Sequence, residues 1–258
     1  MPFQESRKPI DAYDRLWMPD ESFWEKVVPA RVIRPSRVAV QGYAASRKGG
    51  LPTKEAEASL EHDLCTQLEV DPRVYRYALQ PFSLIWRDDS GRQRQYTPDA
   101  FIDFTESAKR MDPTLYPMLV EVKPFEIIRR DWTQLRPRFK MAFHWAYIRG
   151  FRFKVLTERH LRGPRLENSR FLLRFRDCLS PPPPEAGASQ KLVWNAIEEL
   201  EVTTPNQLLD AIGAIDFEKR AQMIPYIWHS LFSGLICADL DKKLTMNSKI
   251  WSPRALWP

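Results

Sequence analysis

Two short apolar runs decide the fold of this chain, Tyr96-Thr97-Pro98-Asp99-Ala100-Phe101-Ile102-Asp103-Phe104 and Leu119-Val120-Glu121-Val122-Lys123. Both have the composition of β-strands, and the polar, proline-containing segment between them is typical of a loop or hairpin connection. Because side chains alternate along a strand, Glu121 and Lys123 share one face, and Asp99 on the neighbouring strand is expected to face them. This arrangement is costly unless a divalent cation and a phosphate fill the space, since Mg²⁺ prefers carboxylate and phosphate oxygens.

Length and composition describe a soluble globular protein. The chain has 258 residues, 43% hydrophobic and 28% charged, enough for one good core or two unequal ones. No run approaches the eighteen apolar residues of a membrane span, and the N-terminus lacks the apolar region of a signal peptide, so we expect a cytoplasmic protein without membrane contact. The scattered cysteines, Cys65, Cys178 and Cys237, indicate buried thiols rather than a zinc site or disulfides.

The net charge of +6 is concentrated in one segment. Between Lys123 and Arg176 there are fifteen Lys and Arg against four Asp and Glu, whereas the rest of the chain has 24 against 29. Such a patch favours phosphate-rich nucleic acid as a partner, and a solvated helix face is the alternative. The candidate DNA-binding residues of this segment are Arg129, Arg130, Arg136, Arg138 and Lys140.

Residues 1–52 are predicted to form an N-terminal arm. Its pattern indicates a short helix at residues 20–28 and an extended segment at 31–40. A basic, glycine-containing loop near its end would touch a DNA backbone through Arg47 and Lys48, with a plain linker as the alternative.

Residues 53–179 are predicted to form an α/β domain. A helix is expected to begin at Thr53, and its i, i+4, i+8 stripe of Leu60, Leu64 and Leu68 would face the core. The following alternation predicts a hairpin within residues 75–96 that leads into the first apolar run.

After Pro124 the period becomes helical. The apolar positions of this basic helix are Trp132, Leu135, Phe139, Phe143 and Tyr147. Pro137 is expected to kink or restart the helix, and Gly150 ends it before a further strand at residues 151–156. The order helix, strands, basic helix, strand predicts a mixed sheet flanked by helices.

Four consecutive prolines, Pro181 to Pro184, predict a semi-rigid spacer, which places a linker at residues 180–189. Residues 190–258 then read as three helices followed by two strands, the arrangement of a winged-helix domain. Such modules often dock DNA through the third helix. Here that helix, within 217–233, carries few cations, so docking to a protein is an equal alternative.

Four residues, Glu61, Asp99, Glu121 and Lys123, have the order and spacing of the restriction-endonuclease-like nuclease core. Glu61 lies beside the leucine stripe, where it would lean toward the sheet, and a solvent-exposed glutamate is the alternative. The upstream acid-bearing helix and the downstream basic helix strengthen the pattern. The competing interpretation is an Asp and a Glu salt-bridged to Lys123 at a sheet edge.

Several further motifs surround these four residues: Ser59-Leu60-Glu61, Asp71-Pro72-Arg73-Val74, Leu79-Gln80-Pro81-Phe82, Gly91, Tyr96-Thr97-Pro98-Asp99 and Glu121-Val122-Lys123. Over about residues 30 to 165 the chain resembles the N-terminal nuclease domain of TnsA, the endonuclease subunit of heteromeric bacterial transposases. Its tail is similar to the second domain of that family. Glu61, Asp99 and Lys123 match the catalytic acid, acid and lysine of the family, and Glu121 matches a position that is Gln or Glu.

The resemblance implies an endodeoxyribonuclease that hydrolyses the non-transferred strand at transposon ends. Mg²⁺, which Mn²⁺ can replace, would be held by Glu61, Asp99 and Glu121 and would activate a water. Lys123 would orient or deprotonate the nucleophile and stabilise charge. The implied partners are double-stranded DNA, an integrase-type transposase subunit and, through the C-terminal domain, an AAA+ ATPase regulator, all at the bacterial nucleoid. The alternatives are a stand-alone restriction or phage DNA-processing nuclease and a non-catalytic DNA-binding regulator.

Overall fold

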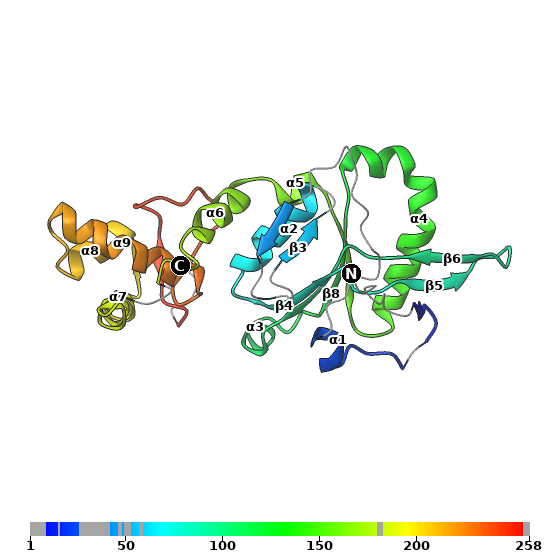
Figure 1. The fold of residues 1–258 in the computed structure, drawn as a ribbon, viewed down its shortest axis with the longest axis horizontal. Helices are drawn as coiled ribbons and strands as arrows, with labels where there is room; N and C mark the ends of the chain where they lie inside the picture. Colours follow the sequence, from blue (N-terminus) through cyan, green and yellow to red (C-terminus); the bar gives the residue numbers. More distant parts are fainter. Residues whose placement is uncertain are drawn as a thin grey trace, which may run out of the picture. The chain divides into compact units, whose positions relative to one another are not determined.

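The computed structural model describes residues 9–14, 16–25, 42–45, 48, 53–56, 59–179 and 183–254 (Figure 1). The chain forms two compact units. The first comprises Met1–Glu69 and Arg73–Leu161, and the second comprises Val70–Pro72 and Arg162–Pro258. None of the helices in the described ranges combines the length and apolar character that a membrane crossing requires.

The first unit is built on a four-stranded sheet whose strands, in spatial order, are β4 (Val74–Leu79), β7 (Ala100–Phe104), β8 (Met118–Val122) and β9 (Arg152–Leu156). The first two pairings are antiparallel, and β8 pairs with β9 in parallel. Parallel neighbours need a crossover connection, which α4 (Phe125–Tyr147) provides. The expected mixed sheet flanked by helices is confirmed.

The two faces of this sheet carry different cores. Phe101 of β7 and Leu119 of β8 lie in a core with Trp145 of α4. Ile102 and Val120 point to the other face, where they lie in a core with α2 (Ser59–Val70). The alternation along the strands therefore puts α4 and α2 on opposite faces.

Helix α2 buries Leu60, Leu64 and Leu68, which confirms the predicted stripe. It begins at Ser59 and not at Thr53, because Thr53–Ala56 form strand β3, paired antiparallel with β2 (Gly42–Ala45). The charged residues of this strand have a sequence typical of the first turn of a helix, but they pair with β2 and are extended.

The described N-terminal residues, 9–14 and 16–25, pack on the first unit. Strand β1 (Ile10–Asp11) pairs in parallel with β5 (Leu84–Arg87), which forms a hairpin with β6 (Gln93–Tyr96). Helix α1 (Glu21–Glu25), within the predicted helical segment, buries Phe23 and Trp24 in the core on the α4 side. These elements are too short for a periodic pattern, which is why the sequence suggested an arm. The expected extended segment at 31–40 lies outside the described residues.

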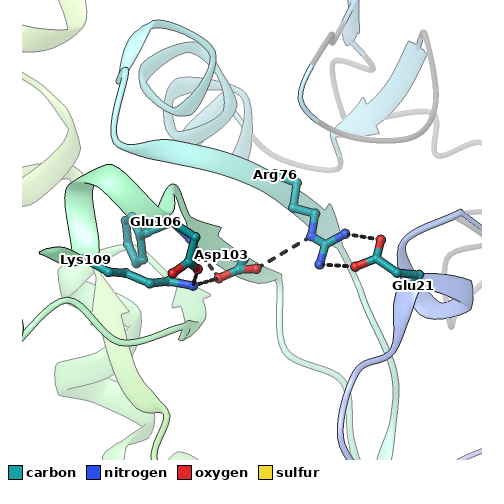
Figure 2. A network of polar contacts seen from close by, with 6 residues as sticks. Glu21, Arg76, Asp103, Glu106 and Lys109 are labelled. Carbon is teal, nitrogen blue, oxygen red and sulfur yellow. Dashed lines mark hydrogen bonds and ion pairs between the residues drawn. The ribbon is translucent and has the colours of Figure 1, made fainter.

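A network of charged side chains joins α1 to the sheet (Figure 2). Arg76 of β4 donates from both terminal nitrogens to the carboxylate of Glu21, at 2.8 and 3.1 Å, and its Nε lies 3.6 Å from Asp103 of β7. Lys109, on α3 (Glu106–Met111), lies 3.0 Å from Asp103. Bidentate pairing of this kind fixes orientation, so the network orients α1 on β4 and β7.

Helix α4 meets the sheet through a different face from the one predicted. Its buried residues are Leu135, Phe139, Ala142, Trp145 and Ala146, whereas Trp132, Phe143 and Tyr147 are about half exposed or more. From Leu135 onward the predicted positions advanced by four residues at a time, and with 3.6 residues per turn such a row drifts off the buried face. The backbone leaves helical geometry at Asp131 (φ −106°, ψ 17°) and not at Pro137.

The second unit contains α6 (Pro164–Leu173), α7 (Ala186–Leu200), β10 (Val202–Thr203), α8 (Pro205–Ala211), α9 (Phe217–Phe232), β11 (Cys237–Ala238) and β12 (Ile250–Trp251). Its strands form an antiparallel sheet in the order β10-β12-β11. The Thr204 side chain accepts a hydrogen bond from the Gln207 backbone N–H, 3.2 Å away, and so caps α8.

The boundary between the units falls between Leu161 and Arg162, about twenty residues before the predicted linker at 180–189. Helix α6 contributes the buried Leu172 to the second core, and Asn168 donates to two carbonyls beyond β11, both at 2.8 Å. A run of prolines predicts a break in secondary structure. It does not predict the boundary between two units, because that boundary depends on packing. The thiols also differ from the expectation: Cys65 is buried and Cys237 partly buried, but Cys178 is exposed.

Candidate active site

Asp99 lies where β7 begins, beside the end of β8. Its backbone N–H donates to the Val120 carbonyl at 3.0 Å, and its Oδ2 accepts from the Val122 N–H at 2.6 Å. Asp99 is therefore tied to β8 through both its backbone and its side chain. The predicted adjacency of this acid to the Glu121 strand is confirmed.

Glu121 is buried, and both of its carboxylate oxygens are bonded. Its Oε1 lies 2.9 Å from Lys123 Nζ, which confirms that the two side chains share a face. Its Oε2 accepts a hydrogen bond from the hydroxyl of Tyr96, 2.6 Å away. Tyr96 ends β6 and its ring lies 6.5 Å from that of Phe139, so the hairpin, α4 and β8 meet at Glu121.

Tyr96 was not among the site residues predicted from the sequence, although it stands in the run that decides the fold. A hydroxyl-bearing aromatic residue close before Asp99 was the available signal. Burial and the charge and hydrogen bond of Glu121 raise the pKa of Tyr96 well above its ordinary value. Its hydroxyl is therefore a permanent donor to Glu121 at neutral pH.

Glu61 lies in the first turn of α2 and is only 7% exposed, so it is not the solvated glutamate of the alternative interpretation. Its negative charge acts on Asp99. Helix α2 thus adds a third carboxyl group to those of Asp99 and Glu121.

Its surroundings disfavour the charged form of the Asp99 carboxyl group. Burial, and after it the charges of Glu121 and Glu61, raise the pKa of Asp99 well above its usual range. The Val122 hydrogen bond and the charge of Lys123 act in the opposite direction without compensating. A further positive charge beside Asp99 would favour its charged form.

Lys123 is a cation in this arrangement. Burial alone would lower its pKa, but the ion pair with Glu121 and the charge of Asp99 outweigh burial, and the pKa of Lys123 lies above its ordinary value. An ammonium group can orient a nucleophile and stabilise negative charge, but it cannot remove a proton. This geometry supports the charge-stabilising part of the predicted role.

The basic residues of α4 fall into two groups. Arg129 lies 3.1 Å from Glu126 and Arg130 lies 2.8 Å from Asp131, so their charges are balanced locally. Arg138 is partly buried, and its charge acts on both Tyr96 and Lys123, the two residues that contact Glu121.

Arg136 and Lys140, also on α4, are exposed and form no ion pair with another described residue. The two candidates from the N-terminal segment differ. Lys48 Nζ donates to the carbonyl of Leu68 at 3.1 Å, near the end of α2, whereas Arg47 lies outside the described residues.

The donor groups at this site suit a divalent cation by their chemistry. Within the described ranges, no three His, Cys, Asp or Glu side chains are already arranged to hold a metal, and Glu121 is engaged by Lys123 and Tyr96. A cation between Asp99 and Glu61 would offset the repulsion that, after burial, raises the Asp99 pKa. The available ligands are all oxygens, as Mg²⁺ prefers.

A mixed sheet with acids and a lysine gathered at the start of β7 and the end of β8, together with an acid from the preceding helix, defines the class of restriction-endonuclease-like nucleases. Residues 71–158 match the family described as TnsA-like endonuclease N terminal. This part of the chain is therefore similar to a TnsA-like endonuclease domain. Asp99, Glu121 and Lys123 lie within the matched residues, and Glu61 lies before them. A comparison with curated proteins gives no match.

Replacing Tyr96 with phenylalanine tests how firmly Glu121 is held. The change leaves Oε2 of a buried carboxylate without its donor, so we expect the free energy of unfolding to fall by about 1–3 kcal/mol. Urea unfolding followed by fluorescence measures it. Tyr147→Phe is the matched control because Tyr147 is exposed, and equal midpoints for both variants would contradict the expectation.

Proposed function

We propose that this protein is a metal-dependent endodeoxyribonuclease that cuts the non-transferred strand at the ends of a mobile element, as one subunit of a heteromeric transposase. The TnsA-like endonuclease domain supports a nuclease role in transposition. The observation that carries the proposal is the clustering of Glu61, Asp99, Glu121 and Lys123 in that unit, with the pKa of Asp99 raised well above its usual range.

Each protein group has a defined task in this proposal. Mg²⁺, or Mn²⁺ in its place, held by Asp99 and Glu61, with Glu121 as the third candidate ligand, would supply an activated water and neutralise the phosphate. The Val122 N–H fixes the Asp99 carboxylate. The Lys123 ammonium stabilises negative charge that develops on the phosphate oxygens.

The DNA backbone would run along α4. Arg138 acts by its charge on residues of the site, and the exposed Arg136 and Lys140 continue the positive charge along the same helix. Arg129 and Arg130 are also exposed and would exchange their local acids for phosphates. Counterion release predicts strongly salt-dependent binding.

The order of α7 to β12, helix, strand, helix, helix, strand, strand, with β12 between β10 and β11, supports the proposal that the second unit contains a winged-helix domain. At the start of α9, the third helix of the proposed winged helix, the apolar Ile215 and Phe217 are 84% and 86% exposed, and Arg220 is paired with Asp210. Exposed apolar side chains and a compensated cation favour docking to a protein over docking to DNA. An AAA+ ATPase regulator is the proposed partner there, and an integrase-type transposase is the proposed second subunit.

A reconstituted excision assay tests the proposed function. The protein is combined with a plasmid that carries the element ends and with the proposed integrase-type transposase and AAA+ ATPase, in Mg²⁺ or Mn²⁺. We expect cleavage of the non-transferred strand only with the full set, and a loss of about 10²-fold in Lys123→Ala.

The control variant for this assay is Lys109→Ala. Lys109 pairs with Asp103 and Glu106 and has no part in the acid cluster, so cleavage should persist. Strong cleavage by the protein alone would favour a stand-alone nuclease of the same fold. Unchanged cleavage by Lys123→Ala would remove its catalytic assignment and favour a DNA-binding regulator.

A further inference from the structure

Gln80 follows β4 directly and has a left-handed backbone conformation, with φ of +43°. Its N–H donates to the Asp99 carbonyl at 2.8 Å, which places the two residues opposite each other across β4 and β7. A residue with a Cβ adopts this conformation at a cost, and such cost persists where the surrounding structure enforces it, often at functional sites.

The Gln80 side chain is a second source of instability in the folded state. The residue is 6% exposed, and its Oε1 is buried without a hydrogen-bond donor among the described residues. A buried amide oxygen that has lost its water without gaining another donor destabilises the folded state. Strain and an unpaired acceptor therefore coincide at the residue that faces Asp99.

The turn after β4 does not require a glutamine. Glycine adopts a positive φ without strain and would leave no unpaired oxygen. The next residue, Pro81, restricts the conformation of Gln80 further and gives no reason for a long amide side chain. A structural role would thus be served better by a smaller residue.

We propose that Gln80 is a further positioning residue of the nuclease site, whose amide oxygen accepts a hydrogen bond from a water of the hydrated divalent cation held by Asp99. The inference rests on the proposed nuclease function. The metal-bound water would be the hydrogen-bond donor that Oε1 lacks, because water bound to a metal is a strong donor. It also accounts for a strained residue whose backbone pairs with Asp99 at this point of the sheet.

Gln80→Gly separates a structural role from the proposed one. Glycine relieves both costs, so we expect thermal unfolding of the metal-free protein to move up by about 2–4 °C. In the same variant, Mn²⁺ affinity measured by titration calorimetry should fall about tenfold, and cleavage in the reconstituted assay should fall at least as much. Gln80→Glu keeps the length and the acceptor, so its Mn²⁺ affinity should not fall.

Two outcomes would overturn the inference. One is a Gln80→Gly variant with the Mn²⁺ affinity and cleavage rate of the original protein. The other is a variant that fails to fold, because it would show that Gln80 serves the structure. The original protein is measured in parallel, which distinguishes the two proposals. If it neither binds Mn²⁺ nor cleaves DNA, the proposed function is wrong. If the original protein and the variant have equal Mn²⁺ affinity and cleavage rate, only the role of Gln80 is wrong.

Discussion

Asp99→Asn is expected to lower DNA cleavage by about 10³-fold and, at the same time, to stabilise the metal-free protein. Asparagine has the size of aspartate and still presents an oxygen to the Val122 N–H, so the local geometry is kept. It carries no charge, so burial and the repulsion from Glu121 and Glu61, which together raise the Asp99 pKa, no longer act against folding. Thermal unfolding in EDTA and the reconstituted cleavage assay measure the two effects.

Asp103→Asn is the matched control, because Asp103 is a second aspartate of the same segment, on β7, the strand that begins directly after Asp99. Its carboxylate is paired with Arg76 and Lys109, so its neutralisation should lower stability and leave cleavage intact. Mn²⁺ should raise the unfolding temperature of the original protein but not that of Asp99→Asn. If Asp99→Asn were destabilised as much as the control, Asp99 would be a structural acid.

The relation between Glu121 and Lys123 could be predicted from the sequence because it depends only on the two-residue repeat of a strand. The place of Asp99 followed from one further step, the pairing of consecutive strands. The stripe of α2 was equally local, since Leu60, Leu64 and Leu68 repeat within one helix. Each of these inferences required a single element or two neighbours.

The remaining features depend on packing between distant segments. Tyr96 reaches Glu121 only because the hairpin folds over the sheet, and the strain at Gln80 appears only in backbone angles. Helix α1 has five residues, too few for a periodic pattern, although its Phe23 and Trp24 complete a core. A sequence pattern reports which residues share a face, but not which distant segment covers that face.

Phe101→Ala is expected to lower the free energy of unfolding of the first unit by about 3–5 kcal/mol. Phe101 is fully buried near the start of β7, and its ring centroid lies 5.3 Å from that of Phe151 and 5.5 Å from the stacked ring of Trp24. Phe23 and Phe82 pack on it at 6.1 and 6.3 Å. Truncation of Phe101 would leave a cavity among these aromatic side chains. They could close it only by leaving their other contacts.

Scanning calorimetry with hydrogen exchange would locate this loss. Because α1 packs on Phe101, its amides should exchange faster in the variant, and the Asp99 strand should lose protection with them. The second unit has a core of its own and should keep its protection. Phe143→Ala, which truncates an exposed ring of α4, should change stability by less than about 0.5 kcal/mol. If α1 exchanged at its original rate in Phe101→Ala, it would not depend on this core, and the N-terminal residues would be an appendage to the nuclease unit.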